Sequence, residues 1–289
     1  MAIRKAVIPV AGFGTRVLPA SKAIPKELLP VFDRPAIDWV VEEARAAGIE
    51  EFIFVTARGK GAIEDYFDKA YELESTLEQQ GKTAFLDDLR ARLPKAGSIA
   101  FVRQQAALGL GHAIGCARNF VGQEPFAILL PDVIVTGAPG CLAEMVAVYD
   151  AQGGNVLAVE QVADEDVSKY GIVDIEASAN GAPRIRAMVE KPSLEDAPSN
   201  LAITGRYILQ PEIFDLIANQ KAGHGGELQL TDPMAELMAR QDFFAVEYDG
   251  RSFDCGNKPG YFEAFVAHAL ADSQHGAACR DILKKLLEN

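Results

Sequence analysis

The sequence predicts an α/β fold with a Rossmann-like mixed, mostly parallel sheet flanked by helices. In the first half of the chain, short apolar runs typical of buried strands alternate with longer segments of helical period. After about residue 155, strand-like runs follow one another directly with glycine and proline between them, which favours a mixed or antiparallel extension. The end of the chain returns to a helical pattern, so we expect C-terminal helices.

Four β-branched or apolar runs are the expected strands of the first half. They are Lys5–Val10, Phe52–Thr56, Ile99–Arg103 and Phe126–Leu130. Because helical segments separate them, we expect right-handed crossovers and parallel pairing. Open sheets of this kind bind their ligands at the carboxyl ends of the strands.

The helices between these strands are predicted from apolar residues that recur every three or four positions. Residues Ala36–Ala47 form one such segment, which stops at Gly48. Two further sets have the same period: Ile63, Phe67, Ala70, Leu73 and Leu77, and then Leu86, Leu89 and Leu93.

The second half is predicted to contain four strands and a helical end. The strands are Val156–Val162, Ile172–Ile175, Ile185–Glu190 and Ala202–Leu209. Two apolar helix faces follow them, one formed by Phe262, Phe265, Val266 and Ala269 and the other by Cys279, Ile282, Leu283 and Leu286.

The charge of the chain excludes two classes of partner. Its 289 residues carry 28 Lys and Arg against 41 Asp and Glu, a net charge of −13, which opposes binding to nucleic acid or to an anionic membrane surface. The first 35 residues are the exception, with six Lys and Arg against two Asp and Glu, and so a local charge of +4. Four cysteines without CxxC spacing indicate reduced thiols and a cytoplasmic protein.

A glycine-rich loop after the first expected strand is the strongest local signal. It reads Ala11-Gly12-Phe13-Gly14-Thr15-Arg16, and Lys26 follows ten residues later. The two glycines allow backbone N–H groups to approach an anion closely, and Arg16 offers a bidentate guanidinium that suits phosphate. An ordinary strand-to-helix turn is the alternative interpretation of this loop.

A nicotinamide-binding site is disfavoured at this loop. The dinucleotide fingerprint needs a third glycine where this chain has Val17. Asp33 lies at a suitable distance for the ribose contact, but Pro30 and Pro35 bracket it and interrupt a second strand. The loop and Lys26 together are instead typical of a site that handles a triphosphate.

The segment Val10–Pro30 resembles the signature of the sugar-1-phosphate nucleotidyltransferase family, and within it the bacterial uridylyltransferases that make UDP-glucose. The likeness extends through nearly the whole chain. It includes Val102–Ala106, Gly109–His112, Leu130–Val133, Tyr170-Gly171, Val189–Pro192, Pro198–Tyr207, Gly226–Asp232 and Asp254–Lys258.

The resemblance implies a fold, a reaction and an assembly. The fold is the nucleotide-diphospho-sugar transferase type, as a single domain over 1–289 with a nucleotide-binding part (1–155), a small strand-rich sugar-binding part (156–257) and C-terminal helices (258–289). The reaction joins UTP and glucose 1-phosphate into UDP-glucose and pyrophosphate. Family members are usually oligomeric, so we expect a homo-oligomer, either a dimer or a tetramer.

Four residues are the expected catalytic groups. Arg16 and Lys26 would neutralise the phosphates, and Asp132 follows a strand at the carboxyl edge, where its hard oxygens suit Mg²⁺. The resemblance adds Lys191 on the sugar phosphate and Asp254 as a second metal ligand. A turn residue is the alternative for Asp132, and a solvated surface cation is the alternative for Arg16 and Lys26.

The remaining expected site residues bind substrate. Family resemblance places Gln105 and the turn at Gly111 on the uracil, and Gly171, Glu190 and Lys191 on the sugar. On the phosphate side the expected contacts are Ala11, Gly12, Gly14 and Thr15. Without the resemblance, Glu190 and Lys191 would be interpreted as a charge pair at a strand end.

Two other functions stay open on the sequence. A thymidylyltransferase that makes dTDP-glucose would share the fold and differ at the base and ribose contacts. A non-catalytic nucleotide-sugar sensor is the second alternative, which the joint presence of Arg16, Lys26, Asp132, Glu190 and Lys191 opposes.

Overall fold

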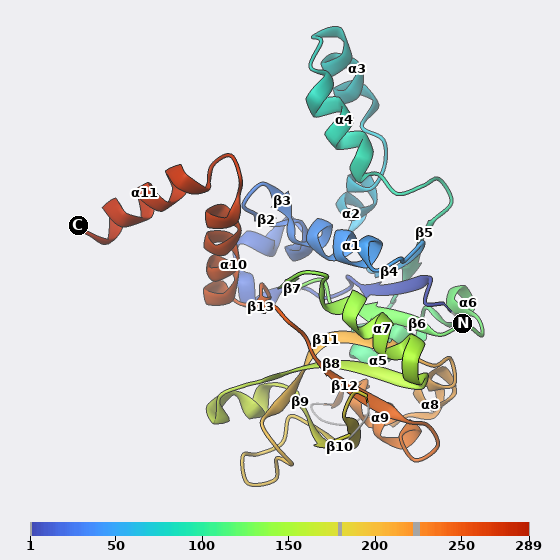
Figure 1. Cartoon of the computed structure of the whole chain (residues 1–289). Coiled ribbons are helices and arrows are strands. Elements are labelled where there is room, and N and C mark those ends of the chain that lie inside the picture. The colour runs from blue at the N-terminus through green and yellow to red at the C-terminus, as the bar shows by residue number, and fades with distance from the viewer. Residues whose placement is uncertain (1, 179–180, 222–225, 289) are drawn as a thin grey trace.

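The computed structural model describes residues 2–178, 181–221 and 226–288, and a nine-stranded sheet runs through this part of the chain with helices on both faces (Figure 1). In order across the sheet, the strands are β5 (Ile99–Arg103), β4 (Glu51–Thr56), β1 (Lys5–Pro9), β6 (Phe126–Leu129), β11 (Leu201–Leu209), β8 (Asn155–Gln161), β12 (Phe243–Glu247), β10 (Arg184–Glu190) and β9 (Gly171–Glu176). The predicted α/β class is confirmed.

The first four strands form the parallel half of the sheet. β5, β4, β1 and β6 pair in parallel, and the eight strand ends agree with the sequence prediction to within one residue. β6 is buried at every position, as expected for a strand covered on both faces. The carboxyl ends of β1 and β6 therefore meet at one edge of the sheet.

The second half is mixed, as predicted. β11 lies antiparallel between β6 and β8, whereas β12 pairs in parallel with β8. β10 runs antiparallel to both β9 and β12. β12, which the sequence pattern did not reveal, connects the late part of the chain to this sheet. The pairing of β11 with β8 is irregular between Ile203 and Tyr207, close to the end of β6.

Helices cover both faces of the sheet through two buried apolar clusters. α1 (Ala36–Ala46) and α7 (Cys141–Gln152) pack on one face, where Ile37, Val40, Leu142 and Met145 meet β1 and β6. α5 (Leu110–Gly115), α8 (Ile213–Asn219) and α9 (Thr231–Leu237) cover the other. The short α6 (Arg118–Val121) follows α5.

One segment that was predicted as a continuous helix is divided into two helices. The apolar period from Ile63 to Leu77 is divided between α2 (Gly61–Tyr66) and α3 (Tyr71–Gln79). Between them the Asp68 carboxylate accepts a hydrogen bond from the backbone N–H of Lys69, a local contact that competes with helix formation.

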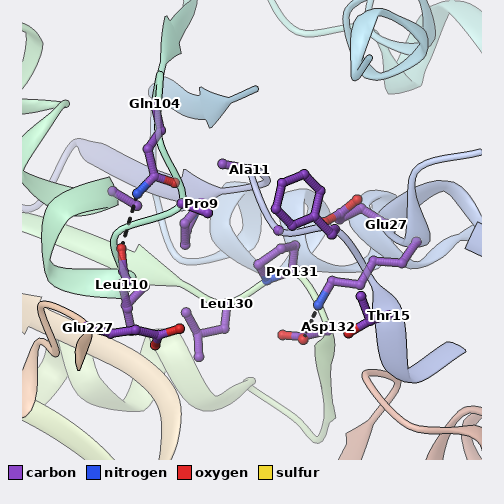
Figure 2. Close-up of a pocket in the computed structure, with 16 residues that line it drawn as sticks. Pro9, Ala11, Thr15, Glu27, Gln104, Leu110, Leu130, Pro131, Asp132 and Glu227 are labelled. Atoms are coloured by element: carbon purple, nitrogen blue, oxygen red, sulfur yellow. Dashed lines mark hydrogen bonds and ion pairs between the residues drawn. The ribbon is translucent and has the colours of Figure 1, made fainter. Parts of the chain in front are cut away.

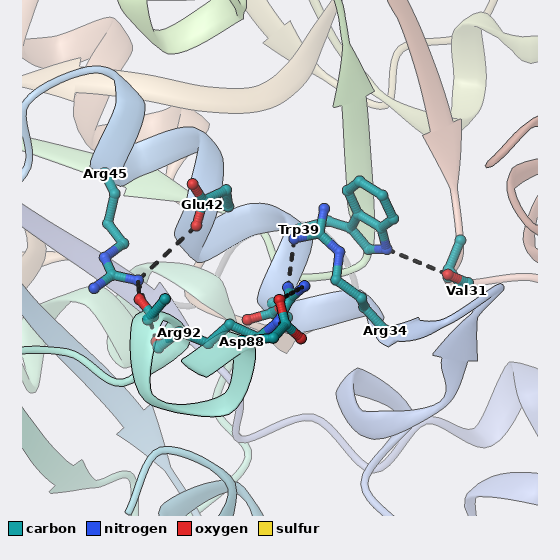
Figure 3. A network of polar contacts seen from close by, with 9 residues as sticks. Val31, Arg34, Trp39, Glu42, Arg45, Asp88 and Arg92 are labelled. Carbon is teal, nitrogen blue, oxygen red and sulfur yellow. Dashed lines mark hydrogen bonds and ion pairs between the residues drawn. The ribbon is translucent and has the colours of Figure 1, made fainter. Parts of the chain in front are cut away.

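α3 and α4 (Thr83–Arg92) extend away from the sheet (Figure 1). A polar network ties the end of α4 to α1 (Figure 3). In it, Arg92 donates to the buried Asp38 carboxylate at 2.9 Å, and Arg34 lies over the Trp39 ring.

The remaining elements are short strands, turns and the C-terminal helices. β7 (Val133–Thr136) pairs with β13 (Arg251–Asp254), and β2 (Pro30–Val31) pairs with β3 (Arg34–Pro35). Short 3₁₀ turns occur at Thr15–Val17, Ala20–Lys22, Lys26–Leu28 and Asp164–Lys169. α10 (Lys258–Ala271) and α11 (Gly276–Leu287) end the chain as predicted. Within the described ranges no helix combines the length and apolar character that crossing a membrane requires.

Candidate active site

A cavity of about 390 Å³ lies at the carboxyl ends of β1 and β6 (Figure 2). The loop after β1, the turn after β6 and the segment leading into α5 form its walls. Its lining residues are Pro9, Ala11, Gly12, Phe13, Thr15, Lys26, Glu27, Gln104, Ala107, Gly109, Leu110, Ala113, Leu130, Pro131, Asp132 and Glu227. Of the predicted site residues, Ala11, Gly12, Thr15, Lys26 and Asp132 are brought together here.

The glycine loop folds back over the segment that carries Lys26. Gly14 has φ +67°, and a Cβ at this position would stand 3.1 Å from the Cβ of Lys26 and from that of Ser21. The Ser21 hydroxyl donates to the Gly14 carbonyl at 2.7 Å. Gly14 is absent from the cavity lining, so its role in this geometry is to let the loop pack closely, whereas Gly12 and Thr15 face the cavity.

An ion pair between Lys26 and Asp132 forms the charged end of the cavity. The Lys26 Nζ donates to the Asp132 Oδ2 at 2.5 Å, with side chains 14% and 17% exposed, and the Arg16 Nη2 lies 3.9 Å from the same oxygen. Burial disfavours the ammonium, but Asp132 outweighs it and raises the pKa of Lys26. Burial also disfavours the carboxylate, yet Lys26, with a contribution from Arg16, holds the pKa of Asp132 below its ordinary value.

Asp254 approaches Asp132 from the end of β13. A Cβ placed on Gly256 would lie 2.8 Å from the Asp254 Oδ1, 2.9 Å from the Asp132 Oδ2 and 3.0 Å from the Arg16 Nη2. The Cys255 N–H donates to the Asp132 carbonyl at 2.7 Å and joins the two loops. Two carboxylates that converge on one point are a donor set that fits a hard divalent cation.

This pair of carboxylates would need further ligands to complete a metal site. In the described part of the chain, no three His, Cys, Asp or Glu side chains are grouped so that they could hold an ion. Mg²⁺ takes one or two protein carboxylates together with substrate phosphates. The geometry therefore fits an ion that arrives with a phosphate ligand.

Gln104, which the sequence analysis missed, lines the end of the cavity away from Lys26 and Asp132 (Figure 2). Its Nε2 donates to the Gly109 carbonyl at 3.2 Å and lies 3.0 Å from the His112 Nδ1, so its oxygen remains as an acceptor. The predicted Gln105 is exposed and does not line this cavity. Gln104 and Gln105 are neighbours, and successive side chains of an extended segment point to opposite sides, so only Gln104 faces this cavity.

Gly111 also lies outside the cavity lining, and backbone packing explains why a glycine occupies this position. Its N–H donates to the Leu228 carbonyl at 2.7 Å, and a Cβ would stand 2.8 Å from that oxygen. Close contact with the backbone of the 228–229 segment explains the glycine. Gly109, two residues earlier, lines the cavity instead.

Gly171, Glu190 and Lys191 form a second cluster where β9 and β10 pair. Gly171 is opposite Glu190 in the register, and the Glu190 Oε1 lies 3.5 Å from the Lys191 Nζ. Thr231, from α9, donates its hydroxyl to the Glu190 Oε2 at 2.6 Å. Lys191 has φ +46°, a left-handed conformation uncommon for a non-glycine residue.

Tyr207 is a buried tyrosine on β11. Burial, and then the negative charges of Glu190 and Asp132, raise the pKa of its phenol. The negative charges of both carboxylates therefore act on the same buried side chain.

Three further lining or contact residues were not singled out from the sequence. Glu27 is 1% exposed and accepts from the Lys60 Nζ at 2.7 Å, and its burial raises its pKa against the effect of Lys60. Glu227 lines the cavity opposite Gln104, and Thr231 contacts Glu190. Each lies inside a segment that carries the family resemblance, but no spacing rule separates these residues from their neighbours.

Comparison with known proteins supports the resemblance. The profile of the family described as nucleotidyl transferase matches residues 5–270. A protein of Staphylococcus epidermidis named UTP–glucose-1-phosphate uridylyltransferase is 44% identical over 284 residues, which are 98% of each chain.

Two solved structures are similar over most of this chain. A UTP-bound UGPase from Acinetobacter baumannii is 43% identical with a TM-score of 0.90, covering 98% of this chain and 99% of that one. A UDP-glucose pyrophosphorylase complexed with UDP-glucose is 40% identical with a TM-score of 0.82, covering 92% of this chain and 98% of that one.

Proposed function

Because this chain belongs to the nucleotidyl transferase family, we propose that it joins UTP and glucose 1-phosphate into UDP-glucose and pyrophosphate. The observation that carries the proposal is one cavity with the amide of Gln104 at one end and the ion pair of Lys26 and Asp132 at the other. A pyrimidine nucleoside triphosphate has the same polarity from base to phosphates. The relatives bound to UTP and to UDP-glucose support this choice of nucleotide and product.

In this proposal Gln104 recognises the base through a hydrogen bond. Its Nε2 is committed to the Gly109 carbonyl, so its Oε1 accepts the N3–H of uracil. Cytosine presents an acceptor at the same position, and two acceptors facing each other leave both without a partner. Gln104 thereby favours UTP over CTP.

The glycine loop and its cations hold the triphosphate. Backbone N–H groups around Gly12, the Thr15 hydroxyl, Arg16 and Lys26 contact the phosphates. An oxygen of the glucose 1-phosphate attacks the α-phosphorus in line, the bond from that phosphorus to the bridging oxygen breaks, and pyrophosphate leaves with the electron pair. The nucleophile is already an anion, so positioning and charge neutralisation supply the catalysis.

Asp132 and Asp254 would hold a Mg²⁺ ion at this end of the cavity. When bound, the ion supplies positive charge to the phosphate oxygens. Lys26 restrains the Asp132 carboxylate at 2.5 Å and keeps it ionised, so the site is organised before substrate arrives.

The cluster at Glu190 holds the sugar. The Glu190 carboxylate accepts from sugar hydroxyls, and Thr231 fixes its orientation through a 2.6 Å hydrogen bond. Lys191 pairs with the sugar phosphate, and Gly171 leaves room for the ring. Under this assignment 1–155 binds the nucleotide, 156–257 binds the sugar and 258–289 forms the C-terminal helices.

The compartment and the assembly are also proposed. The four cysteine thiols, all in the described part of the chain, are free, which supports a reducing compartment such as the cytoplasm. We infer a homo-oligomer, a dimer or tetramer, and the exposed Ile282 and Leu286 of α11 support it. Sedimentation that finds only monomer at micromolar concentration would remove the oligomer.

One assay tests the reaction. The protein is incubated with Mg²⁺, glucose 1-phosphate and either UTP, dTTP, ATP or GTP, and pyrophosphate release is measured. We expect the highest rate with UTP. Faster turnover with dTTP would instead identify a thymidylyltransferase, and nucleotide binding without pyrophosphate release would identify a sensor.

A further inference from the structure

Arg206 is a fully buried charge at the centre of the sheet. It lies on β11 with 0% of its side chain exposed, at the irregular stretch next to the end of β6. All five N–H donors of a guanidinium have partners here. The acceptors are the Glu43 carboxylate (2.8 to 3.2 Å) and the carbonyls of Leu130 (3.2 Å), Gly205 (3.3 Å) and Val133 (2.7 Å).

Two of these carbonyls bracket Asp132. Leu130 and Val133 are the first and last residues of the turn, which its own hydrogen bond from the Val133 N–H to the Leu130 carbonyl closes at 3.3 Å. The Arg206 Nη1 holds one end of the turn and its Nη2 holds the other. Asp132 therefore projects into the cavity from a turn whose two ends are hydrogen-bonded to Arg206.

Glu43 on α1 supplies the opposing charge. Its side chain is 9% exposed, and it also accepts from the Leu142 N–H at the start of α7, at 3.2 Å. Burial disfavours the Arg206 charge, but Glu43 outweighs burial and raises the pKa of Arg206. The guanidinium stays charged and oriented because α1 and α7 fix the carboxylate that faces it.

We propose that Arg206 and Glu43 are a positioning pair that sets the place of Asp132, and through it the affinity of the site for a divalent cation and its turnover. The proposal rests on the proposed function for its kinetic consequence, but cation binding tests it separately. A lysine ends in a single nitrogen, so it cannot reproduce the separate guanidinium nitrogens that hold the two ends of the turn together with the paired contact to Glu43.

The test uses two variants and a matched control. Glu43→Gln removes the opposing charge, and Arg206→Lys keeps a charge pair while removing the fork. Asp38→Asn is the control, because Asp38 lies on the same helix, its side chain is 5% exposed, and it pairs with Arg92 at 2.9 Å and Arg34 at 3.4 Å, neither of which belongs to the turn. Circular dichroism establishes that each variant is folded.

Binding of Mn²⁺ in the presence of UTP, measured by electron paramagnetic resonance, is the readout that does not depend on turnover. We expect Glu43→Gln and Arg206→Lys to weaken Mn²⁺ binding and lower kcat by about tenfold or more, while the KM for glucose 1-phosphate changes by less than about twofold. Asp38→Asn should leave all three within about twofold. Equal losses in Asp38→Asn, or unchanged Mn²⁺ binding in the folded variants, would overturn the positioning role. Wild-type protein that binds Mn²⁺ and releases no pyrophosphate would overturn the proposed reaction alone.

Discussion

Replacement of Asp132 by asparagine separates its catalytic from its structural contribution. Asparagine has nearly the same shape but no charge, so Lys26 loses the partner that it holds at 2.5 Å. We expect turnover with UTP to fall by about 100-fold to 1,000-fold, equivalent to about 2.7 to 4 kcal/mol. Pyrophosphate release at saturating Mg²⁺ and both substrates measures the loss.

The same substitution should destabilise the fold. Removing one partner of a buried ion pair costs about 3 to 5 kcal/mol, and the 14% and 17% exposure of the two side chains favours the lower end. A loss of about 3 kcal/mol lowers the urea midpoint by roughly 1 M. The double variant Lys26→Met with Asp132→Asn removes both charges, so it should regain most of that stability while remaining inactive.

The folding stability of Asp132→Asn should also depend on pH. In Asp132→Asn, burial is no longer opposed by the carboxylate, so the pKa of Lys26 falls below its ordinary value of 10.5. The unfolded chain then binds more protons than the folded one near pH 9, and stability rises with pH. The stability of Asp132→Asn should therefore approach that of the double variant between pH 7 and 10. A constant difference across this range, or near-wild-type turnover of Asp132→Asn, would refute the reasoning.

Three further predictions test the substrate contacts, each by steady-state kinetics. Lys191→Ala should raise the KM for glucose 1-phosphate by about tenfold and that for UTP by less than about twofold, because it removes a charge-assisted contact to the sugar phosphate; equal losses for both substrates count against the assignment. Gln104→Leu should lower kcat/KM for UTP by about 10-fold to 100-fold, whereas Gln105→Leu should stay within about twofold; the reverse order would restore the original prediction. Gly256→Ala places a methyl group 2.8 Å from the Asp254 Oδ1 and should lower kcat by about 100-fold, whereas Gly61→Ala, with nothing within 4 Å, should not.

The parallel half of the fold was readable from the sequence because β1, β4 and β6 are almost entirely buried and the partly buried edge strand β5 is also apolar. Such strands appear as unbroken apolar runs, and the runs at β1, β4, β5 and β6 stand out between polar helices. β12 also contains an apolar run, Phe-Phe-Ala-Val, but it was not among the strands predicted from the sequence. Its place beside β8 depends on pairing between distant segments, which local periodicity does not report.

The candidate site was predictable where a local motif carries the chemistry. The glycine loop and Asp132 each follow a strand that ends at the carboxyl edge, so sheet topology alone brings them together. Gln104 and Gln105 are adjacent and chemically identical, and only the path of the chain after β5 distinguishes them. Thr231 and Arg206 act through contacts with residues 41 and 163 positions away, which no spacing in the sequence encodes.

The acidic net charge and the binding of polyanions are compatible because the site pairs its charges before substrate arrives. Lys26 lies against Asp132 at 2.5 Å, and Lys191 lies 3.5 Å from Glu190. A lysine held in this way is already oriented. A phosphate that binds beside it therefore does not pay the entropic cost of ordering a free side chain. Asp132 keeps Lys26 charged in a partly buried site, and the buried Arg206 holds the turn that carries Asp132. The surplus of acidic residues is therefore compatible with tight handling of phosphates, because what matters is the placement of each carboxylate within reach of a cation.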